Sequence, residues 1–180
     1  MFIQTETTPN PNSLKFIPGK IVSKSGQIEI TKKNEIKNDL VKNLLSINGV
    51  TGVFLSKDFL SINKDQNIDW EDIKHIAQSL IGEFYLEGKD FIYDENITDE
   101  NIKEFQEIEK KIIKILDDKI RPAVARDGGD IQLKEYKNGI VKVQLKGSCS
   151  GCPSSTMTLK QGVQNLLKHY IPEVKEVEAV

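Results

Sequence analysis

An acidic stretch with few apolar side chains divides this chain near its middle, and it limits the possible folds more than any other feature. Residues 94–103 read Asp-Glu-Asn-Ile-Thr-Asp-Glu-Asn-Ile-Lys. A segment of this composition buries too little apolar surface to offset the entropy lost on ordering it. We therefore predict a linker over residues 94–103, between an N-terminal domain over 1–93 and a C-terminal domain over 104–180.

The composition on both sides of this stretch is typical of soluble globular domains. Apolar residues make up 38% of the 180 residues and charged residues 29%, and this length allows two small domains. We expect no membrane partner, because no run approaches the roughly 18 apolar residues of a membrane span. The first residues lack the features of a signal or transit peptide. We therefore expect the chain to stay in the compartment where it is made.

The two halves of the chain differ in the sign of their charge. Residues 1–104 hold 12 Lys and 17 Asp or Glu, a net charge of −5, whereas residues 105–180 carry +3. A basic half can indicate a nucleic-acid partner. The basic residues here do not cluster with interleaved aromatic residues, so we expect no nucleic-acid binding.

The N-terminal domain is predicted to combine strands with two helices. Apolar patterns bounded by turn residues predict strands over 2–7, 14–17, 50–56 and 59–62. Helical spacing predicts a helix that ends at Gly49. A second helix is expected between an N-cap at Asp69 and a stop at Gly88. Its buried stripe is predicted to comprise Ile73, Ile76, Ala77, Leu80, Ile81 and Phe84.

The C-terminal domain is predicted to contain a helix, a hairpin, a second helix and a last strand. Asn138-Gly139 is a strong hairpin signal between strands over 131–136 and 140–146. The last strand is expected over 173–180. The first helix has an apolar face, and Pro122 either ends it or starts a new turn. The apolar face comprises Phe105, Ile108, Ile112, Ile115, Leu116 and Ile120. The second helix is expected to point Leu159, Val163, Leu166, Leu167 and Tyr170 inward and to stop at Pro172. The fold class is thus α+β, with a short sheet packed against helices in each domain.

Three other polar features favour structural rather than chemical roles. We interpret Arg126–Asp130 as a helix-to-strand turn, with glycines that allow positive φ and aspartates that cap the local backbone. A catalytic role for this segment is less favoured. His75 and His169 lie in different predicted helices, and we expect both on the surface.

The chain has two cysteines, Cys149 and Cys152, and both lie between the end of a strand and the start of a helix. A helix N-terminus carries a partial positive charge that favours thiolate over thiol. Thiolates bind soft metals. A secreted disulfide scaffold would have more cysteines at wider spacing. The pair therefore indicates a metal or redox site.

One chain supplies only half of the ligands that such a metal site needs. Two thiolates do not complete a four-coordinate iron–sulfur or zinc site, and the chain has no third cysteine. Two copies related by symmetry would supply four thiolates. A thioredoxin-like redox pair, a structural zinc site and an inert buried pair remain alternatives. The strand before Cys149 is predicted to belong to a hairpin rather than to a βαβ unit, and this disfavours a thioredoxin-like redox pair.

Longer segments around these residues resemble the NifU-like (Nfu) family of iron–sulfur cluster scaffold and carrier proteins. In the C-terminal half the resemblance covers Arg121–Asp130, Gly147–Lys160, Gly162-Val163 and Ile171–Val174. In the N-terminal half Thr5–Phe16 resembles the separate N-terminal Nfu domain that many members have. The order and spacing of these segments are far more specific than a lone Cys-x-x-Cys.

The resemblance implies a function, a cofactor and partners. It implies a 4Fe–4S cluster held by Cys149 and Cys152 of each chain in a homodimer, with no catalytic residues. It implies delivery of the cluster to apo-proteins, supply by upstream assembly proteins, and a three-stranded C-terminal sheet flanked by helices. Since delivery needs exchangeable ligands, we expect the site to be exposed at a dimer seam. We expect a bacterial cytoplasmic protein, or a mitochondrial matrix protein if this is a mature eukaryotic chain.

Overall fold

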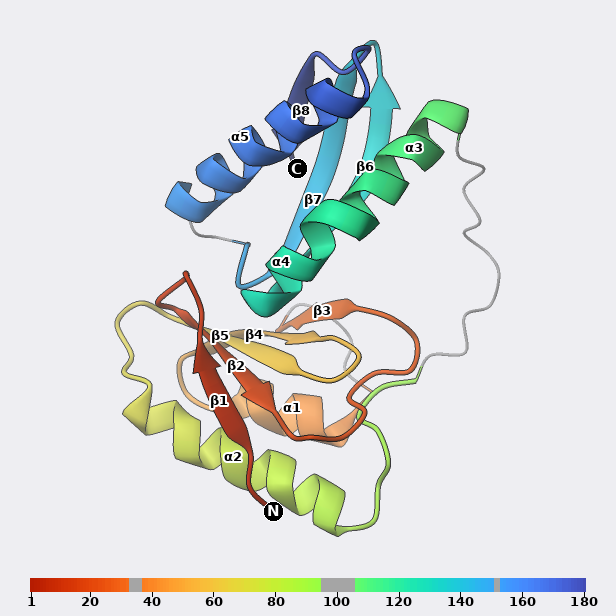
Figure 1. Ribbon diagram of the computed structural model, residues 1–180. Helices are drawn as coiled ribbons and strands as arrows, with labels where there is room; N and C mark the ends of the chain where they lie inside the picture. The colour runs from red at the N-terminus through yellow and green to blue at the C-terminus, as the bar shows by residue number, and fades with distance from the viewer. Residues whose placement is uncertain (33–36, 95–105, 151–152) are drawn as a thin grey trace. The chain divides into compact units, whose positions relative to one another are not determined.

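A computed structural model describes residues 1–32, 37–94, 106–150 and 153–180. The chain forms two compact units, Met1–Thr98 and Asp99–Val180, and each unit has its own hydrophobic core (Figure 1). The predicted linker over residues 94–103 lies outside the described residues apart from Asp94. The predicted domain bounds therefore stay a prediction. Among the described residues, no helix has the length and apolarity needed to cross a membrane.

The N-terminal unit is an antiparallel five-stranded sheet with two helices on one face (Figure 1). The strand order is β1-β2-β5-β4-β3. The strands are β1 Gln4–Thr7, β2 Ser13–Ile17, β3 Ile28–Thr31, β4 Val50–Leu55 and β5 Leu60–Lys64. The helices are α1 Asp39–Ser46 and α2 Glu71–Leu86. Apolar side chains from both helices and from the central strands form one core.

The four predicted strands of this unit are confirmed, with small shifts at their ends. The strand β3 was not predicted, because its four residues offer only Ile28 and Ile30 as an alternating apolar pair. Gly88 directly follows the C-cap of α2 with a positive φ of 84°, as its stop role requires. The predicted stop at Gly49 is wrong, because α1 ends at Ser46 with its C-cap at Ile47 and Gly49, with a φ of 86°, lies in the turn before β4.

Two predictions for α2 are wrong. The N-cap residue is Trp70 rather than Asp69, and its side chain makes no capping hydrogen bond. Ile76 is 51% exposed. Leu80 and Phe84 are partly buried against the core, as predicted, whereas Ile76 lies on the solvent side. The fully buried row of α2 repeats every fourth residue. It comprises Ile73, Ala77, Ile81 and Tyr85.

Because Tyr85 is buried, the unfolding free energy of the N-terminal unit should fall at alkaline pH. Its hydroxyl donates to the carbonyl oxygen of Ile21 at 2.8 Å, and burial raises the pKa of Tyr85 from 10.0 to about 12. Because the unfolded tyrosine loses its proton first, this contribution is present below pH 10.0 and is lost as the pH rises to about 12. Tyr85→Phe should therefore make the decline in unfolding free energy over this range shallower.

The measurement is urea unfolding at several pH values, followed by fluorescence of Trp70, the single tryptophan, which lies in the same unit. Tyr170→Phe, at an exposed position in the other unit, is the matched control and should leave the pH dependence unchanged. Equal slopes for Tyr85→Phe and the parent chain would contradict this role of burial.

The C-terminal unit has a three-stranded sheet in the order β6-β7-β8 with its helices over one face (Figure 1). The strands are β6 Gly129–Lys137, β7 Ile140–Gly147 and β8 Glu176–Ala179. The helical segments are α3 Glu107–Ile115, a π-helical turn over Leu116–Ile120, α4 Arg121–Arg126 and α5 Pro153–Tyr170. The predicted hairpin is confirmed, since Asn138 and Gly139 have φ of 51° and 82°, the left-handed pair of a tight hairpin turn.

The first helix of this unit is interrupted before Pro122. Proline has no N–H for the carbonyl four residues back, and its ring crowds that carbonyl. The chain widens there, so the Arg121 N–H donates to the carbonyl of Leu116, five residues earlier. Pro122 then lies in the first turn of α4. Of the two roles predicted for Pro122, the start of a new turn is the one observed.

Among the described residues, the buried face of the C-terminal unit follows the predicted apolar pattern with one exception, and the predicted face residue Phe105 lies outside them. Val141 and Val143 of β7 are buried, together with Val163 and Leu167 of α5. Tyr170, predicted to point inward, is 51% exposed. It is the last residue of α5, and the buried row continues at the next residue instead, Ile171.

Candidate functional site

Cys149 lies in the loop between β7 and α5, and Cys152 lies outside the described residues. Cys149 is only 7% exposed and belongs to the hydrophobic core of the C-terminal unit. The prediction of an exposed site is therefore wrong for Cys149. Ligand exchange favours an exposed thiolate, but the Cys149 side chain packs into the core of the C-terminal unit.

Hydrogen bonds hold the backbone on both sides of Cys149. On one side, the Ser148 N–H donates to the Gly128 carbonyl oxygen at 3.2 Å, and the Ser148 hydroxyl donates to the carbonyl of Asp127. On the other side, the Ser150 N–H and hydroxyl both donate to the Gly147 carbonyl oxygen, at 3.1 and 2.8 Å. The loop is therefore a defined turn rather than an open connection.

The start of α5 lies against this turn. The Thr156 hydroxyl, in the first turn of α5, donates to the carbonyl oxygen of Cys149 at 3.3 Å. The helix runs for 18 residues from Pro153, so it carries a full dipole with its positive end toward the loop. Such a field stabilises a thiolate relative to a thiol. The predicted placement of Cys149 between a strand end and a helix start is thus confirmed.

The segment Arg126–Asp130 is the predicted helix-to-strand turn. It joins α4 to β6, and Gly128 takes a positive φ of 83°. The capping role predicted for the aspartates is wrong for Asp130. Its side chain is 1% exposed and accepts hydrogen bonds from Arg121 Nε at 2.9 Å and from Arg121 Nη2 at 3.2 Å.

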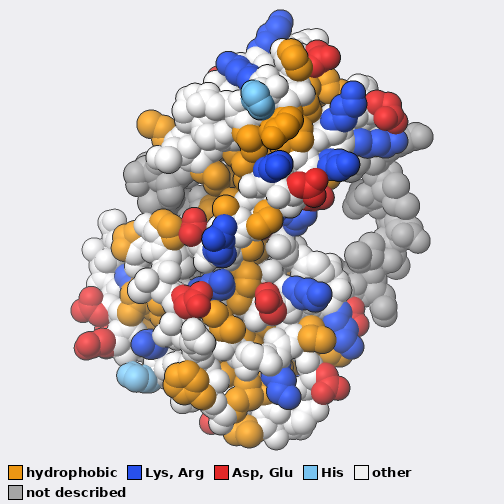
Figure 2. All heavy atoms as spheres, viewed as in Figure 1, with side chains coloured by type: hydrophobic (Ala, Val, Ile, Leu, Met, Phe, Trp, Pro, Cys, Tyr) orange, Lys and Arg blue, Asp and Glu red, His pale blue; other side chains and the backbone are white. Residues whose placement is uncertain are grey.

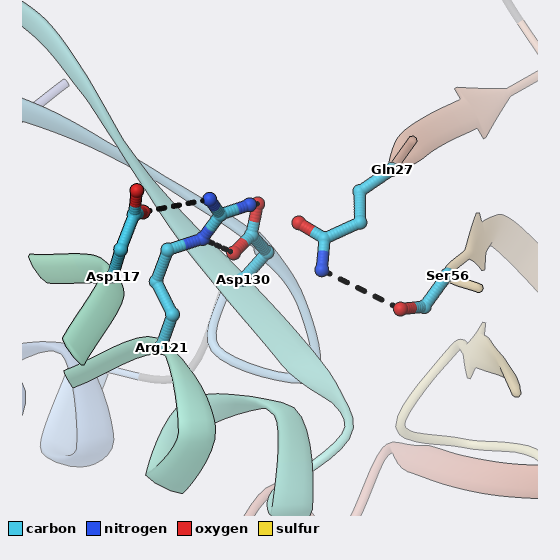
Figure 3. Close-up of polar contacts among 5 residues, drawn as sticks. All are labelled: Gln27, Ser56, Asp117, Arg121 and Asp130. Atoms are coloured by element: carbon cyan, nitrogen blue, oxygen red, sulfur yellow. Dashed lines mark hydrogen bonds and ion pairs between the residues drawn. The ribbon is translucent and has the colours of Figure 1, made fainter. Parts of the chain in front are cut away.

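Arg121 joins two carboxylates (Figure 3). Its Nη1 donates to Asp117 Oδ1 at 2.8 Å, one helical turn earlier. Burial alone lowers the pKa of Arg121, but its hydrogen bonds to Asp130 and Asp117 outweigh burial and raise the pKa above its ordinary value. Arg121 therefore remains charged and holds the first residues of β6 against the end of the π-helical turn.

Sequence reasoning missed this group. The four-residue spacing from Asp117 to Arg121 is a readable signal for the exposed contact. The contact with Asp130 depends on how α4 turns back onto β6, and no local pattern indicates it.

The described residues offer no second candidate for a metal site. His75 and His169 are exposed, as predicted. Within the described part of the chain, no three His, Cys, Asp or Glu side chains come together as a metal-binding group. Among the described residues, the loop that holds Cys149 is thus the candidate site for a soft metal.

One sequence argument against a redox role is wrong. The strand β7 pairs antiparallel with β6, but it also pairs in parallel with β8, in the register Ile140↔Glu176 through Val143↔Ala179. The path from β7 through α5 to β8 is therefore a βαβ crossover. The cysteine loop opens the helix of that crossover, which is also the position of a thioredoxin-like pair. The topology is therefore compatible with both functions.

Charged side chains of both signs are interspersed on the face of the molecule drawn in Figure 2. On each unit, the described Lys and Arg side chains of that face lie among Asp and Glu side chains.

Comparisons with known proteins match both halves of the chain. Residues 112–178 match the model of the NifU-like domain, and residues 3–88 match that of the scaffold protein Nfu/NifU N terminal. The human protein named NFU1 iron-sulfur cluster scaffold homolog, mitochondrial, is 43% identical over 183 residues, which cover 100% of this chain and 72% of that protein. Its namesake from Drosophila persimilis is 42% identical and is covered over 65% of its length.

A solution structure of a NifU-like protein from Saccharomyces cerevisiae shares 28% identity with this chain. It covers 53% of this chain and 87% of its own, with a TM-score of 0.49. Membership in a family therefore rests on the sequence relatives.

Proposed function

Since this chain belongs to the Nfu/NifU family of iron–sulfur cluster scaffold proteins, which are not catalytic enzymes, we propose that it carries a 4Fe–4S cluster between two copies of itself. The ligands are the thiolates of Cys149 and Cys152 from each copy. The cluster is cargo, received from upstream assembly proteins and delivered to apo-proteins. The site works in a reducing compartment, the bacterial cytoplasm or the mitochondrial matrix, where thiols stay reduced.

The number of cysteines carries this proposal. The chain has two, both at the junction of β7 and α5, and a cluster of this kind takes four thiolates. A symmetric pair of chains meets the requirement with one contact surface used twice. A single chain leaves half of the iron coordination to solvent or to a partner.

The burial of Cys149 bears on how the cluster would be released. A thiolate that is 7% exposed in the separate chain does not exchange ligands without some movement of its loop. The bonds that hold the loop are those of Ser148, Ser150 and Thr156. A few hydrogen bonds of about 1 kcal/mol each allow such opening in the folded state. Delivery then begins with the loop and not with unfolding of the domain.

A thiol–disulfide redox protein is the second candidate, because the cysteine loop opens the helix of a βαβ crossover. In that case Cys149 and Cys152 of one chain would cycle between dithiol and disulfide. Such a protein works as a metal-free monomer and turns over dithiol substrates. The cluster carrier takes up iron and sulfide and becomes dimeric, so one preparation separates the two functions.

The test is anaerobic reconstitution with iron, sulfide and a thiol reductant. We expect a brown protein with about four irons and four sulfides for every two chains, and an elution volume shifted to the dimer. Dithiol oxidation assays on the same protein should give no catalytic turnover. Colourless protein that oxidises dithiols catalytically would support the redox candidate, and colourless protein with tightly held zinc would support a structural zinc site.

A further inference from the structure

The backbone of Gly129 passes unusually close to the sulfur of Cys149. A methyl group added at the Gly129 Cα would lie 2.7 Å from Cys149 Sγ and 3.2 Å from Cys149 Cβ. It would also lie 2.6 Å from the carbonyl oxygen of Lys146. Ordinary contacts between such atoms are about 3.5–4.0 Å. The side chain of Cys149 and the backbone carbonyl of Lys146 thus occupy the space that any other residue at 129 would fill.

The two adjacent glycines of this turn are needed for different reasons. Gly128 has a φ of 83°, a conformation that side chains disfavour. Gly129 is outside that region and begins β6, where it pairs with Gly147. Its requirement is therefore for space and not for conformation. The space is limited by the Cys149 side chain and by the backbone carbonyl of Lys146.

The surroundings decide which group would move if the space were filled. The residue after Gly129 is Asp130, and Arg121 holds its buried carboxylate through two hydrogen bonds. The residue before Cys149 is Ser148, which is bonded to the same turn through Gly128 and Asp127. Both backbone segments are fixed to each other and to α4. The carbonyl oxygen of Lys146 belongs to the backbone of the paired strand, so a methyl group at 129 also shifts the start of β6 against β7. The Cys149 sulfur rotates about χ1 and is the contact that moves most easily, so a side chain at 129 would turn the sulfur out of the core.

We propose that Gly129 is a positioning residue for the Cys149 thiolate and that the Arg121–Asp130 ion pair holds it in place. The turn at the start of β6 fixes the position of the Cys149 sulfur and keeps it buried until the loop opens. This inference rests on the proposed function, because the Cys149 sulfur is a proposed cluster ligand. Its geometry concerns the cluster-free chain and can be tested there.

The test is the rate at which iodoacetamide alkylates Cys149 in the reduced, cluster-free, full-length chain, measured by peptide mass spectrometry. We expect Gly129→Ala to raise this rate at least about fivefold, because a displaced thiol becomes accessible in the native fold. Gly162→Ala is the matched control. It places the same methyl group on α5, where there is nothing within 4 Å, and should leave the rate unchanged.

The dependence on urea separates positioning from lost stability. Labelling that occurs through unfolding accelerates steeply with low concentrations of urea, whereas labelling of a displaced thiol does not. A folded Gly129→Ala chain that alkylates Cys149 at the parental rate would overturn the proposal. So would a faster rate that appears only through unfolding.

A second variant applies if Gly129→Ala does not fold. Arg121→Lys keeps the charge but loses the paired hydrogen bonds to Asp130. The turn at the start of β6 is then held less firmly, and labelling of Cys149 should increase. Arg126→Lys, at an exposed position of the same helix, is its control. Equal labelling in both lysine variants would overturn the proposal. Failure of the parent chain to bind a cluster would contradict the proposed function but would leave these labelling results standing.

Discussion

Cys149→Ala should reduce the iron retained after anaerobic reconstitution from about four atoms per two chains to a background level. In a symmetric pair the substitution removes two of the four thiolates at once, so the remaining ligands hold at most a labile fragment. The chain has no third cysteine that could replace the lost ligand. The measurement is iron and sulfide content after desalting, with the visible absorption spectrum recorded on the same sample.

The control must separate a lost ligand from a damaged loop. Met157→Ala changes a side chain that is 73% exposed on α5, close in sequence to the cysteines, and should retain the full iron content. Cys149→Ser adds a second comparison, because it keeps the size of the buried side chain while removing the thiolate. A Cys149→Ala protein whose cluster is as stable as that of the parent would show that Cys149 is not a ligand.

The second large effect concerns stability. Arg121→Ala leaves the carboxylate of Asp130, which is 1% exposed, without the guanidinium that neutralises it. Removing one partner of a buried pair costs about 3–5 kcal/mol, and the partial exposure of Arg121 makes the expected loss smaller than for a fully buried pair. We therefore expect the C-terminal unit to lose about 2–4 kcal/mol of unfolding free energy.

Hydrogen exchange of the β7 amides in the full-length chain measures this loss, since Trp70 reports only on the other unit. Asp117→Ala is the matched control. It removes the exposed contact of the same arginine, because the Asp117 side chain is 45% exposed, and should cost less than about 1 kcal/mol. Equal losses from the two variants would contradict the view that Asp130 is the partner that matters.

Local chemistry explains which parts of the fold could be predicted. Asn138-Gly139 needs only its own two φ angles to define the hairpin, and the stop at Gly88 likewise depends on one residue. The placement of Cys149 follows from the pattern on either side of it. The strand β3 was missed because four residues hold too little periodicity, and Asp69 was misassigned because helix starts shift by a residue or two.

Tertiary contacts explain what could not be predicted. The parallel pairing of β7 with β8 depends on where the chain returns after α5. A strand, a helix and a strand in succession are a signal for such a crossover, but the hairpin signal predicts only the pairing of β7 with β6. The contact between Arg121 and Asp130, and the close approach of Gly129 to Cys149, join residues from separate elements. No sequence spacing specifies either one.

The stoichiometry of the loaded protein is the decisive quantity for the proposed carrier. Native mass spectrometry of the anaerobically reconstituted full-length chain should show one dominant species of two chains with four irons and four sulfides, and Cys149→Ala should remove it. The dimer should separate into single chains when the cluster is removed by an iron chelator. A single chain that retains a complete cluster, or a dimer loaded with zinc alone, would contradict a cluster shared by Cys149 and Cys152 of two copies.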